Sequence, residues 1–62
     1  MTPRQYLAEV RVRRAADLLR ATQRGVKQIA QEVGYTNLQI FRRTFIWVLG
    51  MPPLRMRLRG LG

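Results

Sequence analysis

The sequence lacks the residues on which most stapled small domains and most enzyme sites depend. It contains no cysteine and no histidine, so it can form no disulfide and has no Cys/His set that could hold zinc. Its only carboxylates are Glu9, Asp17 and Glu32. Glu9 and Asp17 each lie four residues from Arg13, which is the spacing of ordinary ion pairs on a helix surface. We therefore expect no catalytic site, no metal site and no cofactor.

Long apolar runs are missing as well. No stretch reaches the roughly 18 apolar residues that a membrane-spanning helix needs, and no signal-peptide pattern opens the chain. We therefore expect no membrane partner and a location in the cytoplasm, whose reducing conditions are compatible with the lack of cysteine. With 62 residues the chain forms one small domain at most. A chain of this size buries only about 60% of the surface that it exposes when unfolded.

The residue type in excess is arginine. Twelve basic residues, of which eleven are arginine, face three acidic ones and give a net charge of +9. A guanidinium group pairs bidentately with phosphate and with the edge of guanine, whereas lysine acts as a point charge. A balance this one-sided is typical of nucleic-acid-binding domains and exceeds what solubility alone requires. Charge alone also fits a cationic membrane-active peptide, which a folded spectrum in plain buffer would exclude.

Residues 1–23 predict one long helix. The Thr-Pro-Arg-Gln start at residues 2–5 supplies a capping threonine, a proline at the first helical position and the glutamine of a capping box. No helix-breaking residue follows before the expected end near Thr22. The apolar residues of this helix form one broad face, and Tyr6 and Val10 form a second one. Two apolar faces are typical of a helix that lies between two packing partners.

A turn at residues 23–25 separates this helix from a second, short one. The spacing i, i+3, i+4, i+7, which indicates about two amphipathic turns, is carried by Val26, Ile29, Ala30 and Val33. Gly34 follows at the position where a helix commonly ends in a left-handed residue. Gly34 and Tyr35 therefore form the predicted structural turn between the second helix and the third.

A third helix is expected from about Asn37 to Leu49, with its end at Gly50. Thr36 is placed to cap this helix, and Gln39 lies three residues on, as in a capping box. Two helices joined by a tight turn that contains glycine form the helix-turn-helix layout, in which the second helix enters the major groove of DNA. An ordinary helical hairpin shows the same pattern, but the net charge favours DNA binding.

The third helix has two different faces. At about 100° per residue, Phe41 and Phe45 project to one side, where we expect them to fill a core. Gln39 and Arg43 project to the opposite side, with Arg42 beside them. We expect Gln39 and Arg43 to read base edges and Arg42 to hold a phosphate. Capping of the helix is the structural alternative for Gln39.

Residues 51–62 predict a short helix or a basic tail. After a pair of prolines, arginines alternate with apolar residues, a period that suits a strand better than a helix. The segment is too short to pair as a strand, so we expect a frayed tail that touches phosphates. Arg55 and Arg57 are the expected phosphate contacts in this tail, and Lys27 is the expected one in the second helix.

Five segments follow one another along the chain: TPRQYL, RVRRAADLL, VKQIAQEVGY, FRRTF and GMPPLRMR. Their order and spacing resemble the DNA-binding domain of the AraC/XylS transcription regulators over almost the whole chain. The resemblance implies two helix-turn-helix units joined by a long central helix. Residues 1–23 would be that central helix and residues 24–50 the second unit. A first unit, missing here, would pack on Tyr6 and Val10.

The resemblance also implies action at bacterial promoters, with RNA polymerase as a further partner. It places a base reader at Leu38, near the start of the recognition helix, and a structural arginine at Arg11. Ile46 and Trp47 stand where the family usually carries polar residues. Together with the second apolar face of the first helix, they support an alternative function, a protein-interaction fragment that docks another regulator and binds DNA only residually.

These patterns predict an all-α fold that consists of a long helix, a helix-turn-helix and a short C-terminal helical turn. The chain would be a single partial domain. Its predicted function is sequence-specific binding of double-stranded DNA in bacterial transcription regulation.

Overall fold

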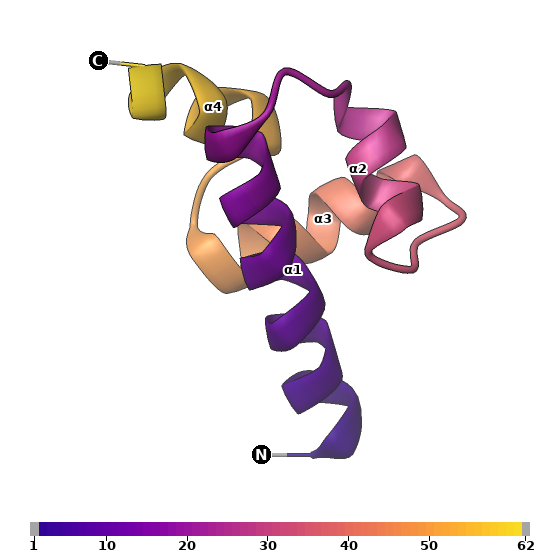
Figure 1. The fold of residues 1–62 in the computed structure, drawn as a ribbon. Helices are drawn as coiled ribbons and strands as arrows, with labels where there is room; N and C mark the ends of the chain where they lie inside the picture. The colour runs from indigo at the N-terminus through magenta and orange to yellow at the C-terminus, as the bar shows by residue number, and fades with distance from the viewer. Residues whose placement is uncertain (1, 62) are drawn as a thin grey trace.

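The chain consists of four α-helices joined by short connections (Figure 1). The computed structural model describes the backbone of residues 2–61 and the side chains of residues 2–59, so the outermost positions of the predicted ranges 1–23 and 51–62 lie outside it. The helices are α1 (Pro3–Ala21), α2 (Val26–Glu32), α3 (Leu38–Leu49) and α4 (Pro53–Leu61). The described residues include no strand, and the predicted all-α class is confirmed.

α1 begins as predicted. The N–H of Thr2 donates to Oε1 of Gln5 at 2.9 Å, and the N–H of Gln5 donates to the hydroxyl of Thr2 at 3.2 Å. This reciprocal pair is the expected capping box, and Pro3 occupies the first helical position. The helix ends where the N–H and the hydroxyl of Thr22 both donate to the carbonyl oxygen of Leu18, at 2.9 and 2.7 Å. The expected end near Thr22 is therefore confirmed as well.

α2 ends in the predicted turn at Gly34, whose φ is +108°. The N–H of Gly34 donates to the carbonyl oxygen of Gln31 at 3.1 Å, and the N–H of Tyr35 donates to that of Ala30 at 2.8 Å. These two bonds form a Schellman motif, which satisfies carbonyl groups that a helix end leaves without partners. A positive φ is costly for any residue that carries a Cβ, so glycine is what lets the chain turn here toward α3.

α3 begins one residue later than predicted. Its cap is Asn37, whose Oδ1 accepts a hydrogen bond from the N–H of Ile40 at 3.1 Å. The expected capping box of Thr36 and Gln39 is therefore wrong. Asparagine caps a helix at least as well as threonine does, and its use leaves Thr36 free to extend the turn. The predicted end is confirmed, because Gly50 closes the helix with a φ of +79°.

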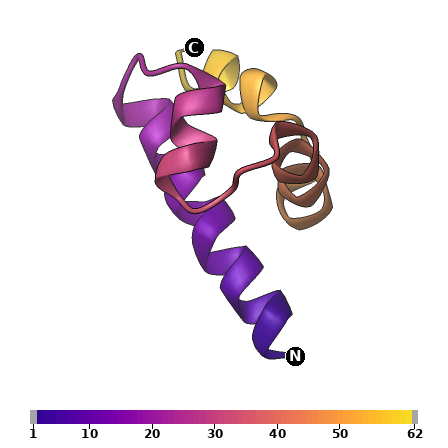
Figure 2. The ribbon, with the colours of Figure 1, turned by 90° about the vertical axis from the view of Figure 1, so that its right-hand side faces the viewer.

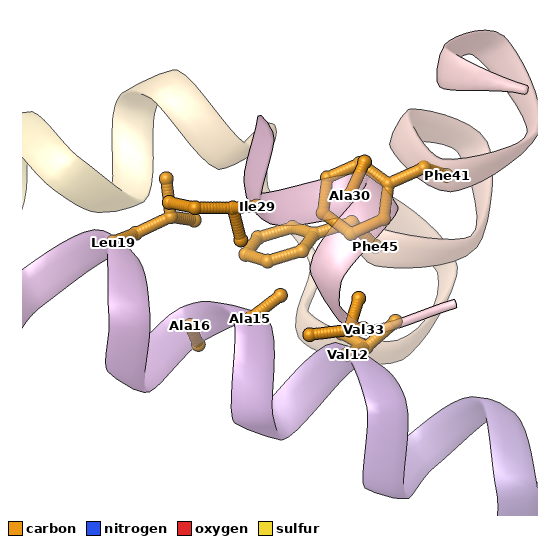
Figure 3. Close-up of a cluster of buried hydrophobic side chains, with 9 residues drawn as sticks. All are labelled: Val12, Ala15, Ala16, Leu19, Ile29, Ala30, Val33, Phe41 and Phe45. Atoms are coloured by element: carbon orange, nitrogen blue, oxygen red, sulfur yellow. The ribbon is translucent and has the colours of Figure 1, made fainter. Parts of the chain in front are cut away.

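The core lies where α1, α2 and α3 meet (Figure 3). The rings of Phe41 and Phe45 have centroids 5.7 Å apart at an angle of 57°, and the Tyr35 ring lies 5.4 Å from that of Phe41. Tilted contacts of this kind are favourable for aromatic rings. The expectation that the phenylalanines fill the core is confirmed. The buried side chains are Val12, Ala15, Ala16, Leu19, Ile29, Ala30, Val33, Phe41 and Phe45.

The C-terminal segment forms a helix, α4, which confirms the predicted short C-terminal helical turn and not the frayed tail that the alternating arginines suggested. Pro53 is buried at the first helical position, where its fixed φ suits a helix. Met56 packs on the core, and Arg57 reaches the carbonyl oxygen of Leu19 in α1. Figure 1 shows α4 beside the C-terminal end of α1. Because these contacts come from a distant part of the sequence, the local pattern did not decide between the helix and the tail.

α1 has a packed half and an open half. Its C-terminal half carries the buried face, whereas its N-terminal half extends beyond the other three helices (Figures 1 and 2). Tyr6, Leu7 and Val10 are exposed there. The second apolar face predicted from the sequence therefore has no partner among the described residues.

We expect Gly34→Ala to lower the free energy of unfolding by about 1–2 kcal/mol, because alanine is strained at positive φ. A Cβ at this position would also lie 3.2 Å from Cζ of Arg11. Chemical denaturation followed by circular dichroism measures the loss. The comparison variant is Gly25→Ala, since Gly25 has a φ of −64° and no atom within 4 Å of an added Cβ. Gly25 is the N-cap of α2, so this variant shows the cost of alanine at a cap without strain, and the loss in Gly34→Ala should exceed it. Equal losses in the two variants would contradict the assigned conformation of Gly34.

Candidate nucleic-acid interface

The outward face of α3 lies opposite its buried face. Burial of Phe41 and Phe45 sets the rotation of the helix about its own axis. At about 100° per residue, Gln39 and Arg43 then fall on the far side, and both are exposed. They are four residues apart, so their side chains are neighbours on the helix surface. The structure therefore brings together the two residues that the sequence predicted to read base edges.

Neither Gln39 nor Arg43 has a side-chain hydrogen bond or an ion pair with another described residue. Because Asn37 caps α3, the Gln39 side chain is not needed for the cap. The ion pairs of the described residues lie elsewhere, between Arg13 and Glu9 at 3.7 Å and between Arg24 and Glu32. Arg42 and Arg43 therefore keep an uncompensated positive charge. The face presents the exposed amide of Gln39 and the exposed guanidinium of Arg43.

Leu38 does not belong to this face. Its side chain is half-buried and packs against the core. At the first position of α3 it lies about 100° from Gln39, toward the buried side of the helix. The prediction of Leu38 as a base reader is not supported, because packing on the core turns this side chain inward. Leu38 instead anchors the start of α3.

A small cavity of about 170 Å³ marks the place where the starts of α2 and α4 meet α3. Its lining residues are Val26, Leu38, Arg42, Pro53 and Leu54. Lys27 and Arg55 directly follow two of these residues in the chain, and both are exposed. Of the predicted phosphate contacts, Arg42 lines this cavity, and Lys27 and Arg55 are exposed near the starts of α2 and α4. Arg55 lines a separate hollow with Gly50, Met51, Leu58 and Arg59.

Arg57, the fourth predicted phosphate contact, has protein partners instead. Its half-buried side chain donates from Nε to the carbonyl oxygen of Leu19 at 3.2 Å, and from Nη2 to the carbonyl oxygens of Thr22, at 3.4 Å, and Arg24. The last carbonyl groups of a helix lack partners within the helix and carry partial negative charge. A guanidinium satisfies both needs. Arg57 therefore holds α4 against the end of α1 and the following turn, which corrects the prediction.

The turn before α3 is supported from α1. Cζ of Arg11 lies 5.7 Å from the centroid of the Tyr35 ring, within the range of a cation–π contact. The same guanidinium lies against Gly34, and the Tyr35 ring packs on Phe41. The expected structural position of Arg11 is confirmed by these contacts. Together they hold the turn in place and so determine where α3 begins.

Sequence reasoning missed two polar contacts that position this interface. Asn37 did carry a signal, since asparagine is among the strongest capping residues and directly precedes the apolar pattern of α3. Arg57 carried none, because its carbonyl partners come from a different helix. Both residues act by placing helices, and neither lies on the outward face of α3.

Other kinds of site are not seen in the part of the chain that the structure describes. Within residues 2–59, no three His, Cys, Asp or Glu side chains are grouped so that they could hold a metal ion. Over the same described part, no helix combines the length and apolarity needed to cross a membrane. The distinguishing feature of this surface is therefore its arginine charge.

A family model described as a helix-turn-helix domain matches residues 1–59 of the chain. The chain belongs to this family. The match confirms the AraC/XylS-type resemblance seen in the sequence and makes DNA binding in transcription regulation the general function of this helix-turn-helix domain. Members of such a family are typically not enzymes. Neither a curated protein nor a solved structure matches the chain.

We expect Arg57→Met to lower the free energy of unfolding by about 1.5–3 kcal/mol, the usual worth of hydrogen bonds to a charged group. Methionine keeps an apolar stem but loses the donors that hold the end of α1. Urea denaturation gives the difference. Arg55→Met, at an exposed position of the same helix, is the matched control and should leave stability unchanged. Wild-type stability in Arg57→Met would show that the guanidinium does not hold α4.

Proposed function

We propose that this helix-turn-helix domain binds double-stranded DNA sequence-specifically, with α3 in the major groove. The observation that carries the proposal is the pair Gln39 and Arg43, exposed and unengaged on the face opposite Phe41 and Phe45. The major groove is wide enough to admit an α-helix, and it shows a different pattern of donors and acceptors for each base pair.

The two side chains suit different bases. The Gln39 amide can donate to N7 and accept from the N6 amino group of adenine, and the Arg43 guanidinium can donate to both O6 and N7 of guanine. One helical turn separates them, about 6 Å along the axis. Base pairs stack at about 3.4 Å, so the two residues would contact base pairs roughly two steps apart.

Phosphate contacts position the helix in the groove. Arg42 lies on the side of α3 that meets the starts of α2 and α4, and Lys27 and Arg55 are exposed on those two helices. The sugar-phosphate backbone would pass these residues if α3 occupied the groove. Contacts of this kind fix register and orientation but carry no sequence information. They also release counterions, so affinity should fall steeply as salt rises.

We place the domain as the second half of an AraC-type DNA-binding domain, acting in the bacterial cytoplasm. A first helix-turn-helix unit would pack on Tyr6, Leu7 and Val10, which are exposed on the open half of α1. RNA polymerase is the further partner that the family implies. A single groove-reading unit gives few contacts, so binding by residues 1–62 alone should lie near the non-specific range of about 10⁻⁴–10⁻⁶ M at physiological salt.

A second candidate function is docking of another regulatory protein, with only residual DNA binding. Trp47 is 64% exposed and lines a groove of about 380 Å³ with Gln5, Glu9 and Val48. Gel shifts in rising salt with competitor DNA separate the two functions. Selective shifts that survive competitor support DNA reading, whereas no shift at low salt, together with stable association to a protein, supports docking.

Arg43→Ala should flatten the preference for a selected duplex over random DNA, because a bidentate contact to guanine is worth about 1–3 kcal/mol of discrimination. Arg55→Ala should weaken binding to both duplexes about equally and reduce the salt slope by about one phosphate. Fluorescence anisotropy titrations of each variant against both duplexes, at several salt concentrations, measure these effects. If Arg43→Ala lowers both affinities by one factor, Arg43 contacts phosphate and the reading face is wrongly assigned.

A further inference from the structure

Three large apolar side chains stand on the outer surface of α3 beside the polar reading pair. Ile40, Ile46 and Trp47 are 53%, 45% and 64% exposed, and none of them packs against the core. Exposure of single apolar side chains is common on protein surfaces and by itself assigns them no role. The position of each around the helix decides what it can contact.

Ile46 lies in line with the reading pair. At about 100° per residue it falls within about 20° of Gln39 and about 60° of Arg43, so the three residues form one row with the spacing i, i+4, i+7. Ile40 and Trp47 lie on the far flank of Arg43, about 80–100° from Gln39. Trp47 borders the groove that it shares with Gln5 and Glu9 of α1, and Ile46 is not part of that groove.

The row formed by Gln39, Arg43 and Ile46 is long enough to span several stacked base pairs. Seven residues of helix rise about 10 Å from Gln39 to Ile46, which is about three base-pair steps of 3.4 Å. A helix that sets Gln39 and Arg43 against base edges therefore carries Ile46 along the same groove floor. Ile46 has no group that can form a hydrogen bond, so it can recognise only an apolar feature there.

The major groove offers one such feature. Among the unmodified bases, only thymine shows a methyl group, on C5, and apolar side chains recognise it by contact. Isoleucine is suited to this contact, because its β-branched side chain is restricted at χ1 and holds its methyl groups in a defined place. We infer that Ile46 is a specificity-determining residue that selects thymine at the end of the site nearest the C-terminus of α3. This inference rests on the proposed major-groove binding.

The test removes the methyl group from the DNA and the side chain from the protein. A duplex is selected from random sequence with the wild-type chain, and each thymine in it is replaced in turn by deoxyuridine, which pairs identically but lacks the C5-methyl group. At one thymine we expect the replacement by deoxyuridine to lower the affinity of the wild-type chain about fourfold. This factor corresponds to about 0.8 kcal/mol, the usual worth of one buried methylene-sized group, here the C5-methyl group. Ile46→Ala should bind the thymine and deoxyuridine duplexes equally.

Ile40→Ala is the matched control, because it removes the same side chain from the other flank of the helix and should keep the fourfold preference for thymine. Both positions are exposed and alanine favours helix, so circular dichroism should show both variants folded.

If the wild-type chain prefers the selected site but binds the thymine and deoxyuridine duplexes equally, the inference is wrong and the proposed function stands. If Ile46→Ala keeps the preference, or Ile40→Ala loses it, thymine is read elsewhere. If the wild-type chain does not prefer the selected site over random DNA, both proposals fail.

Discussion

The burial of Phe41 and Phe45 against α1 and α2 is the contact on which the surface of this protein depends. A helix has a fixed angle per residue, so once these two rings point inward, the side chains that face outward are determined. Gln39 and Arg43 face solvent for that reason alone. Removing one such ring from a core costs about 3–5 kcal/mol. The free energy of unfolding of a whole domain is only about 5–15 kcal/mol. Loss of one of these rings would therefore destabilise the fold and, with it, the outward face of α3.

Local contacts around the turn before α3 determine the residue at which this helix begins. The Schellman motif at Gly34, the Asn37 cap and the Arg11 contact each contribute on the order of 1 kcal/mol. Their larger effect is geometric. They fix the residue at which α3 begins and the direction in which the chain enters it. The turn therefore positions the interface, although its residues do not lie on the outward face of α3.

The arginines of this chain share the same guanidinium group but differ in whether that group has a partner within the protein. One group of arginines is engaged within the protein, on carbonyl oxygens, carboxylates or an aromatic ring, and the other keeps its charge for a ligand. Engaged arginines include Arg11, Arg13, Arg24 and Arg57. Arg42, Arg43 and Arg55 are exposed and have no ion pair among the described residues. The net charge of +9 attracts DNA at long range, but only the second group is available to bind it at contact distance.

The sequence by itself determined the first three helices, their inward and outward faces, the glycine turn and the basic charge. Periodicity and capping act between residues at most a few positions apart, so a single sequence displays them. The sequence predicted the wrong cap, Thr36 in place of Asn37, because two adjacent capping residues compete and the preceding turn decides between them. The tertiary structure alone decided between the helix and the tail for α4, and it alone decided that Leu38 packs inward and that Arg57 binds a carbonyl group of α1 38 positions away. A guanidinium fits a phosphate and a helix end equally well, so its partner is whichever of them the fold brings within reach.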